Sequence, residues 1–282
     1  NSAMATGAFF DLQPGDKALL CLPVEYIAGK MMLVRAMILG FELDYVLPSS
    51  NPLGPVEKEY DFCAMVPLQL QNSLNSIEKI KKLIVGGAPM SIQLKKQVQH
   101  KSTEVYETYG MTETITHVAV KRINGVAERS RSHFKAISNI VFSKDHRECL
   151  VIDAPKVSDD LVLTNDIVDL ISDTEFLWLG RFDNVINSGG VKLFPEQIEA
   201  KLAELILNKF FVAGLPDEKL GQKLVLMVEG EVKKDTLMKN IKKLPTLTKV
   251  EFPKEIYSVP KFSETDSGKV QRNKSLEMLF HK

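Results

Sequence analysis

Two short segments of the chain combine glycine with polar residues in a way that suits a nucleotide site. The first is GGAP at 86–89, which directly follows the apolar run KLIV at 82–85. Glycines at the end of a strand let the backbone approach a ligand closely, and ligands of open α/β sheets bind beyond the strand ends. Considered alone, GGAP is explained at least as well by a plain turn.

The second segment is YETYGMTE at 106–113, which offers little to a hydrophobic core. The hydroxyl of Thr112 can donate to a phosphate oxygen, and the carboxylate of Glu113 can hold Mg²⁺. The ring of Tyr109 can stack on a base. The alternative interpretation is a polar loop packed on one tyrosine.

Aspartate and arginine recur in TND at 164–166 and in GRFDN at 180–184. Asp166 can accept hydrogen bonds from ribose hydroxyls, and Arg181 can add a donor from the other side. Either segment alone is more often a surface turn.

A lysine in a glycine-containing loop, SGK at 267–269, can reach a phosphate as a point charge. The chain contains no GxxxxGK[ST] run, so this is not a P-loop. Taken alone, a lysine in such a loop is usually a surface residue.

The apolar pattern predicts the elements that position these residues. Short apolar runs alternate with helical periodicity, which favours an α/β layered domain with a mainly parallel sheet. The strands are expected at 17–22, 62–66, 82–85 and 103–106, and the helices at 28–39, 67–76 and 91–100. Residues 137–181 are short strand-like pieces typical of a β-rich subdomain.

A polar, glycine-ended stretch at 181–190 predicts a hinge, and Pro195 begins a new helix beyond it. Residues 1–3, which precede Met4, resemble a cloning remnant and are set aside. The predicted domains are residues 4–182, with an α/β part at 4–118 and a β-rich part at 119–182, and residues 183–282, a smaller α+β domain.

Composition excludes several classes of function. The net charge is zero, so no global field attracts nucleic acid or an acidic membrane, and apolar runs are too short to span a bilayer. The basic stretch at 121–135 lacks interleaved aromatics and is expected to be a solvated loop. The three cysteines have neither metal nor redox spacing, which fits the cytoplasm.

The order of six segments resembles the adenylate-forming superfamily of acyl-CoA synthetases, adenylation domains and luciferases. These segments are LPVEYIAG (22–29), GGAP, YGMTE, TND, GRFDNVINSGG (180–190) and PK…SGKVQR (260–272). The resemblance covers essentially the whole chain. Within the superfamily, residues 112–124 and 176–199 are most similar to the o-succinylbenzoate–CoA ligases of menaquinone biosynthesis.

The resemblance implies an enzyme that joins a carboxylate to AMP from ATP, with Mg²⁺, and then transfers the acyl group to coenzyme A. Thr112 and Lys269 would be catalytic, with Lys269 between the carboxylate and the α-phosphate, and Glu113 would hold the metal. The implied nucleotide contacts are Gly86, Gly87, Ala88, Pro89, Tyr109 and Gly110, with Asp166 and Arg181 on the ribose.

The resemblance also implies a small mobile C-terminal domain that rotates about Asp183 between the two half-reactions. Gly189 and Gly190 would then move toward coenzyme A. Arg35 matches an arginine that meets the aromatic carboxylate of the acid, although a helix-surface arginine is an equal alternative. Tyr26 would line the acyl pocket.

Three departures from the superfamily pattern stand out. The Ser/Thr/Gly-rich phosphate loop expected well before residue 18 is missing, Glu25-Tyr26 replaces an aromatic-histidine pair, and TND replaces TGD. The sequence therefore leaves open two alternatives to an o-succinylbenzoate ligase. One is another acyl or aryl acid–CoA ligase or a carrier-protein-loading module, and the other is a truncated, inactive adenylate-binding fragment. The oligomeric state is also open, including a homo-oligomer.

Overall fold

A computed structural model describes residues 1–126, 133–265 and 270–280 of the chain. The chain divides into two compact units, which are described separately. The first comprises Asn1–Thr164 and Val168–Trp178, and the second comprises Asn165–Ile167 and Leu179–Lys282.

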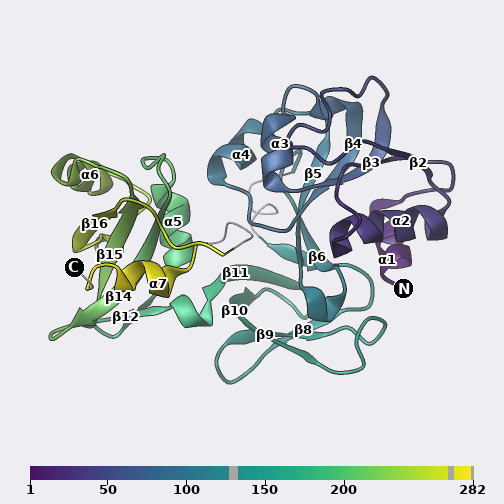
Figure 1. Cartoon of the computed structure of the whole chain (residues 1–282). Coiled ribbons are helices and arrows are strands. Elements are labelled where there is room, and N and C mark those ends of the chain that lie inside the picture. Colours follow the sequence, from purple (N-terminus) through teal and green to yellow (C-terminus); the bar gives the residue numbers. More distant parts are fainter. Residues whose placement is uncertain (127–132, 266–269, 281–282) are drawn as a thin grey trace. The chain divides into compact units, whose positions relative to one another are not determined.

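One long sheet organises the first unit (Figure 1). In the described residues its eleven strands have the order β2-β1-β3-β4-β5-β6-β7-β11-β10-β9-β8. The elements up to the end of β6 are α1 (Ser2–Phe10), β1 (Lys17–Leu20), α2 (Ile27–Leu39), β2 (Glu42–Tyr45), β3 (Tyr60–Met65), α3 (Pro67–Asn72), β4 (Ile80–Val85), α4 (Ile92–Gln97), β5 (Glu104–Gly110) and β6 (His117–Arg122). The remaining strands are β7 (Phe134–Ala136), β8 (Val141–Lys144), β9 (Cys149–Asp153), β10 (Val162–Leu170) and β11 (Glu175–Arg181).

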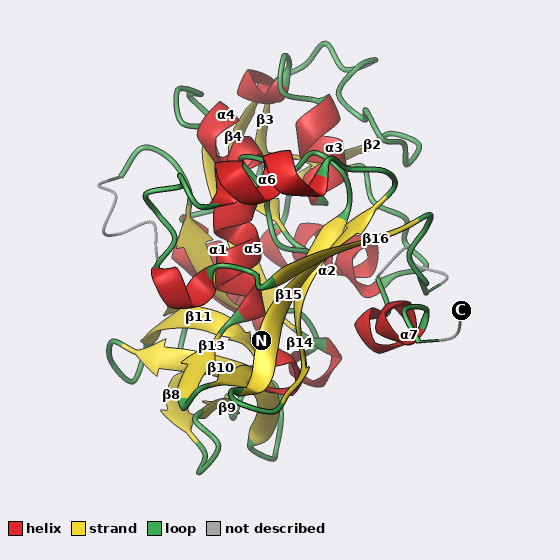
Figure 2. Cartoon of the chain, turned by 90° about the vertical axis from the view of Figure 1, so that its left-hand side faces the viewer, coloured by secondary structure: helices red, strands yellow, loops and turns green. Residues whose placement is uncertain are grey.

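The strands β2, β1, β3, β4 and β5 are parallel neighbours. Helices cover both faces of this part, because successive residues of a strand point to opposite faces. Phe10 of α1 and Met32 of α2 belong to the core on one face. Leu70 of α3 and Leu94 of α4 belong to the core on the other. The predicted α/β layered domain is confirmed, and the β7–β11 region consists of strands and their loops (Figure 2).

Three local predictions about the first unit are wrong. The strand expected at 103–106 continues to Gly110, because Tyr106 to Gly110 pair with β6 on their other side. The helix expected at 67–76 ends at Asn72. Residues 1–3 are not separate from the fold, since α1 begins at Ser2 and the side chain of Ala3 is buried.

The basic stretch at 121–135 is also only partly a loop. Lys121 and Arg122 end strand β6, and Phe134 begins β7. The side chain of Lys121 is only 13% exposed and forms an ion pair with Glu107. A charged run predicted to be solvated therefore contributes a buried cation, while residues 127–132 lie outside the described residues.

The second unit is a smaller α+β fold. Its elements are β12 (Ile186–Ser188), β13 (Val191–Leu193), α5 (Pro195–Leu202), β14 (Phe210–Asp217), β15 (Gly221–Glu229), α6 (Lys234–Ile241), β16 (Glu255–Val259) and α7 (Arg272–Glu277). The sheet order is β13-β12-β15-β14, and β16 pairs with β15. Ile198 of α5 and Ile241 of α6 pack on one face of this sheet, and Leu276 of α7 packs with the core of the other.

Candidate functional site

The carboxyl ends of the parallel strands share one edge of the first sheet, and three of the recognised segments begin there. LPVEYIAG follows β1, GGAP follows β4, and YGMTE contains the end of β5. This is the edge at which open α/β sheets bind their ligands. The topology therefore brings together segments that lie far apart in the sequence.

The GGAP turn is packed tightly against β5. The backbone N–H of Gly86 donates to the carbonyl of Met65 at 3.1 Å, and the hydroxyl of Thr108 donates to the carbonyl of Val85 at 3.2 Å. A Cβ atom added to Gly86 would lie 2.3 Å from Oγ1 of Thr108. Only glycine fits here, because the turn and the strand are in direct contact.

The YGMTE segment divides into a buried and an exposed part. Tyr109 lies in β5, and its ring centroid is 5.7 Å from that of Phe134 and 5.2 Å from that of Phe176. After Gly110, residues Thr112–Thr114 form the 3-10 turn η2. Its first two residues, Thr112 and Glu113, are exposed, and nothing of the chain covers the predicted phosphate and metal contacts.

Thr114 holds this turn in place. Its side chain is buried, and its hydroxyl is 3.0 Å from the carbonyl of Met111 and 2.8 Å from that of Thr116. Ile115 adopts a left-handed conformation with φ 65°, which is uncommon for a β-branched residue. The hydroxyl and carboxylate of Thr112 and Glu113 are therefore presented by a turn that its neighbours fix.

Arg35 is not a helix-surface residue, so that alternative is wrong. Its side chain is 1% exposed, and its guanidinium is 3.3 Å from Oγ1 of Thr6, 3.4 Å from Oγ1 of Thr116 and 3.4 Å from Nδ1 of His117. Burial lowers the pKa of Arg35 to about 10. Among the ion pairs of the described residues, none joins Arg35 to a carboxylate.

His117 is the functional residue that sequence reasoning missed. Its buried ring faces Arg35 through Nδ1 and Thr6 through Nε2, which is 3.4 Å from the Thr6 hydroxyl. Burial, and then the charge of Arg35, lower its pKa to about 3, so the ring is neutral. Position alone was the available signal, because His117 comes four residues after Glu113 and begins β6.

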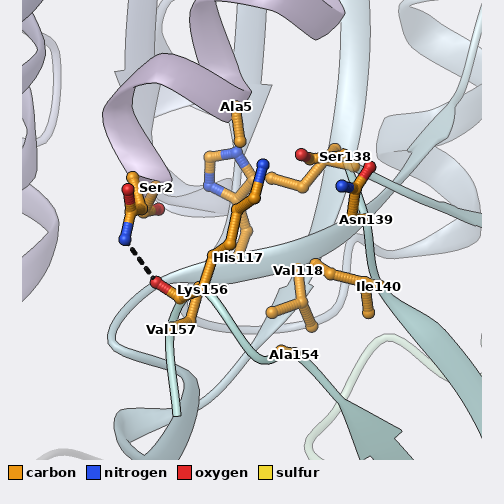
Figure 3. A pocket seen from close by; sticks show the side chains of 12 residues that line it. Ser2, Ala5, His117, Val118, Ser138, Asn139, Ile140, Ala154, Lys156 and Val157 are labelled. Carbon is orange, nitrogen blue, oxygen red and sulfur yellow. Dashed lines mark hydrogen bonds between the residues drawn. The ribbon is translucent and has the colours of Figure 1, made fainter.

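His117 also lines a recess in the first unit (Figure 3). The walls are α1, through Ser2 and Ala5, and the segments that carry Ser138 and Ala154. The ring of Tyr26, which the sequence placed in an acyl pocket, lies at the start of α2 and is 70% exposed.

In the second unit the two proposed ribose contacts lie together. Nη1 of Arg181 is 3.5 Å from Oδ1 of Asp166, and Nη2 of Arg181 is 4.0 Å from Oδ2 of Asp183. The amide of Asn165 also donates to Asp183 at 3.3 Å. TND lies inside β10 and Arg181 ends β11, so neither segment is the surface turn considered as the alternative.

The glycines of NSGG form a tight hairpin turn. Gly189 and Gly190 connect β12 to β13 and have φ values of 59° and 83°. Positive φ at both central residues is the geometry of a type I′ turn, which glycine adopts without steric cost. Asp183 lies just before this hairpin, in the 3-10 turn η4 (Phe182–Asn184).

Lys269 lies outside the described residues, but Arg272 in the same motif is well placed. Its guanidinium forms a two-pronged ion pair with Glu199 at 2.7 and 2.8 Å and lies 3.7 Å from Glu196. It also donates to the carbonyl of Val212 at 3.1 Å. This cluster attaches the start of α7 to α5 and β14.

The residues present fit a magnesium ion that is shared with a substrate. Across the described part of the chain, no group of three or more His, Cys, Asp or Glu side chains could hold a metal ion. Magnesium in ATP-using enzymes is commonly bound by one or two carboxylates together with substrate phosphates. A single exposed carboxylate such as Glu113 suits that arrangement.

No helix in the described residues is both long and apolar enough to cross a membrane.

Comparisons with known proteins place the chain among enzymes that bind AMP. The AMP-binding family, described as "AMP-binding enzyme", matches residues 1–153. An acyl-CoA synthetase (AMP-forming)/AMP-acid ligase II-like protein from Dyadobacter fermentans is 40% identical, with a TM-score of 0.64. The alignment covers 99% of this chain and 82% of that one.

More distant relatives have the same fold. The 2-succinylbenzoate–CoA ligase of Staphylococcus aureus is 25% identical over 90% of this chain and 57% of its own length. The o-succinylbenzoate coenzyme A synthetase of Bacillus subtilis, solved with ATP and magnesium, has a TM-score of 0.82 at 19% identity, over 98% of this chain and 64% of that one. The chain thus spans less than two thirds of the length of these curated relatives. With the family match over more than half of its length, the chain belongs to the family of AMP-binding enzymes.

Proposed function

We propose that this chain carries an ATP-dependent acid–CoA ligase activity of menaquinone biosynthesis in the cytoplasm. The enzyme joins the carboxylate of o-succinylbenzoate to AMP, releases pyrophosphate, and transfers the acyl group to coenzyme A. The observation that carries the proposal is the shared edge of β4 and β5, where GGAP packs against the strand that ends in YGMTE. The similarity to 2-succinylbenzoate–CoA ligases supports the choice of acid.

At this edge the proposed nucleotide contacts are the 86–89 turn and the residues of YGMTE. Tyr109 and Gly110 lie against the base, and the hydroxyl of Thr112 donates to the α-phosphate. Glu113 supplies a carboxylate oxygen to Mg²⁺, which offsets phosphate charge when it is bound. The exposure of Thr112 and Glu113 supports these roles, because a phosphate can reach both.

In the second unit, Asp166 is the proposed acceptor for ribose hydroxyls, with Arg181 beside it. Their separation of 3.5 Å supports a joint role. Asp183 is the proposed hinge, and the Gly189–Gly190 turn is proposed to approach coenzyme A. Lys269 is the proposed donor that stabilises the charge of the carboxylate and the α-phosphate as they react.

The acid is proposed to be recognised through Arg35, with Tyr26 at the acyl pocket. A buried guanidinium that has hydroxyls and a neutral imidazole as neighbours is well suited to a carboxylate, because the two form charge-assisted hydrogen bonds. This pairing would neutralise a charge that burial disfavours. The aromatic carboxylate of o-succinylbenzoate is the proposed partner, and its succinyl carboxylate is the one that is adenylated.

A panel of acids tests the proposal. AMP release is measured with ATP, Mg²⁺ and coenzyme A for o-succinylbenzoate, benzoate, a fatty acid and 4-oxo-4-phenylbutanoate, which lacks only the aromatic carboxylate. The assay uses this chain and, in parallel, the polypeptide encoded by its complete gene. We expect o-succinylbenzoate to be the best substrate, with AMP release dependent on coenzyme A.

Two results would contradict the proposal at different levels. If o-succinylbenzoate is no better than the other acids, the choice of acid is wrong. If no acid promotes pyrophosphate exchange into ATP in either polypeptide, the ligase activity itself is wrong, and a binding role is favoured. Acyl transfer to a carrier protein, but not to coenzyme A, would favour an adenylation module.

A further inference from the structure

Glu107 has a buried carboxylate that none of the proposed nucleotide contacts uses. It lies in β5, two residues before Tyr109, and is 4% exposed. Its Oε1 accepts a hydrogen bond from the backbone N–H of Met90 at 2.7 Å. Its Oε2 lies 2.8 Å from the ammonium of Lys121 and 2.9 Å from that of Lys95.

These contacts place Glu107 at the far end of the GGAP turn. Thr108, the next residue of β5, contacts the near end through Val85 and Gly86. Met90 follows the turn directly, and its own side chain is buried in the core beneath α4. Two adjacent residues of β5 therefore hold the two ends of one four-residue turn.

The charges around Glu107 keep it ionised. Burial raises its pKa, but the charges of Lys121 and Lys95 outweigh burial and bring the pKa below its usual value. The bond from Met90 is consequently charge-assisted, which makes it shorter and stronger than a neutral one. Lys121 also lies 4.3 Å above the ring of Phe134, next to Tyr109.

A buried ion cluster of this kind is a weak source of stability, because desolvation cancels much of its Coulomb energy. Two cations for one anion leave an excess positive charge, which an apolar replacement would avoid. Stability alone therefore gives little reason for this arrangement. A role in fixing the backbone does, since the carboxylate is the partner of a buried N–H that must be satisfied.

We propose that Glu107 is a positioning residue, whose carboxylate, held by Lys95 and Lys121, fixes Met90 and so the GGAP turn in its nucleotide-binding shape. This inference rests on the proposed function, in which the turn contacts the adenylate. It predicts that losing Glu107 weakens nucleotide binding through the turn, although Glu107 itself touches no nucleotide.

The test compares Glu107→Ala with Glu104→Gln, a control on the same strand. Glu104 forms an ion pair with Arg122 at 3.3 Å and a hydrogen bond with Tyr106, away from the turn. Two quantities are measured: the dissociation constant of ATP with Mg²⁺, by calorimetry, and the hydrogen–deuterium exchange of the Met90 amide. Since a hydrogen bond to a charged group is involved, Glu107→Ala should change both by about tenfold to a hundredfold, and the control by less than about threefold.

A double variant covers the case in which Glu107→Ala does not fold. Glu107→Gln with Lys121→Met keeps an acceptor for Met90 and removes one buried cation, so amide protection and ATP affinity should return to within about threefold of the original. A folded Glu107→Ala with unchanged exchange and affinity overturns the inference, as does a double variant with a protected amide but weak binding. If the unmodified chain binds no ATP, the proposed function fails, while the exchange measurement still decides whether Glu107 fixes the turn.

Discussion

Replacing Arg35 with methionine should make the protein no less stable while removing recognition of the acid. Methionine is a flexible, unbranched residue that fills irregular core space, and Met32 already lies beside the guanidinium, with its sulfur 3.9 Å from Nη1. The substitution removes a buried charge that has hydroxyls and a neutral ring around it. It leaves helix α2 intact, because both residues are good helix formers.

The expected stability change follows from the burial of the charge. Burial lowers the pKa of Arg35 to about 10, and at about 1.4 kcal/mol for each pKa unit the buried charge costs about 3 kcal/mol. The lost hydrogen bonds to Thr6 and Thr116 are long, at 3.3 and 3.4 Å, and together contribute about 1–3 kcal/mol. The free energy of unfolding should therefore stay the same or rise by about 2 kcal/mol.

The catalytic effect should have the opposite sign. Removing one partner of a buried charge pair costs about 2–5 kcal/mol in binding, so kcat/KM for o-succinylbenzoate should fall by on the order of 10²-fold. The acid 4-oxo-4-phenylbutanoate lacks the aromatic carboxylate and should be little affected. Stability is measured by urea unfolding and kcat/KM by AMP release, with Lys30→Met, an exposed cation on the same helix, as the control.

Two results would refute this reasoning. A loss of more than about 2 kcal/mol in the free energy of unfolding would show that Arg35 is a structural anchor whose bonds outweigh its desolvation. An equal loss of kcat/KM with both acids would show that Arg35 does not distinguish the aromatic carboxylate.

Two further predictions concern other buried groups. The pKa of His117 is lowered to about 3, below its unfolded value, so stability is present above about pH 6.5 and is lost as the pH falls toward 3. His117→Gln should reduce this loss in urea unfolding at pH 4 compared with pH 7, and an unchanged pH dependence would contradict it. Arg272→Met leaves the carboxylates of Glu196 and Glu199 without their cation and should cost about 3–5 kcal/mol. Burial raises the pKa of Glu199 to about 7, so protonation relieves the defect: melting should be depressed more at pH 8 than at pH 5, and a loss independent of pH would count against this explanation.

Short-range patterns predicted the elements of both units well. The apolar run KALL is β1, and the helical periodicity after residue 27 is α2, which ends where Gly40 adopts φ 72°. Pro195 begins α5, as its place at the start of an amphipathic pattern predicts. These predictions succeeded because strand and helix periods are set by which residues must be buried.

Strand ends were predicted less well, because they depend on partners elsewhere in the chain. YETYG contains too few apolar residues to read as a strand, yet all of it pairs with β6. The three residues before Met4 were likewise excluded for their composition, although α1 begins among them. Pairing and packing across the chain supplied what local composition did not.

The sequence by itself determined which chemical groups the site has and along which segments they lie: glycines after β4, Thr112 and Glu113 after β5, and an aspartate and an arginine in TND and GRFDN. Only the tertiary structure decided the environment of each charge. It buried Arg35 beside His117 and enclosed Glu107 between two lysines. The physical reason is that burial and ion pairing arise where distant strands and helices meet, and a side chain's own segment does not specify what will lie against it.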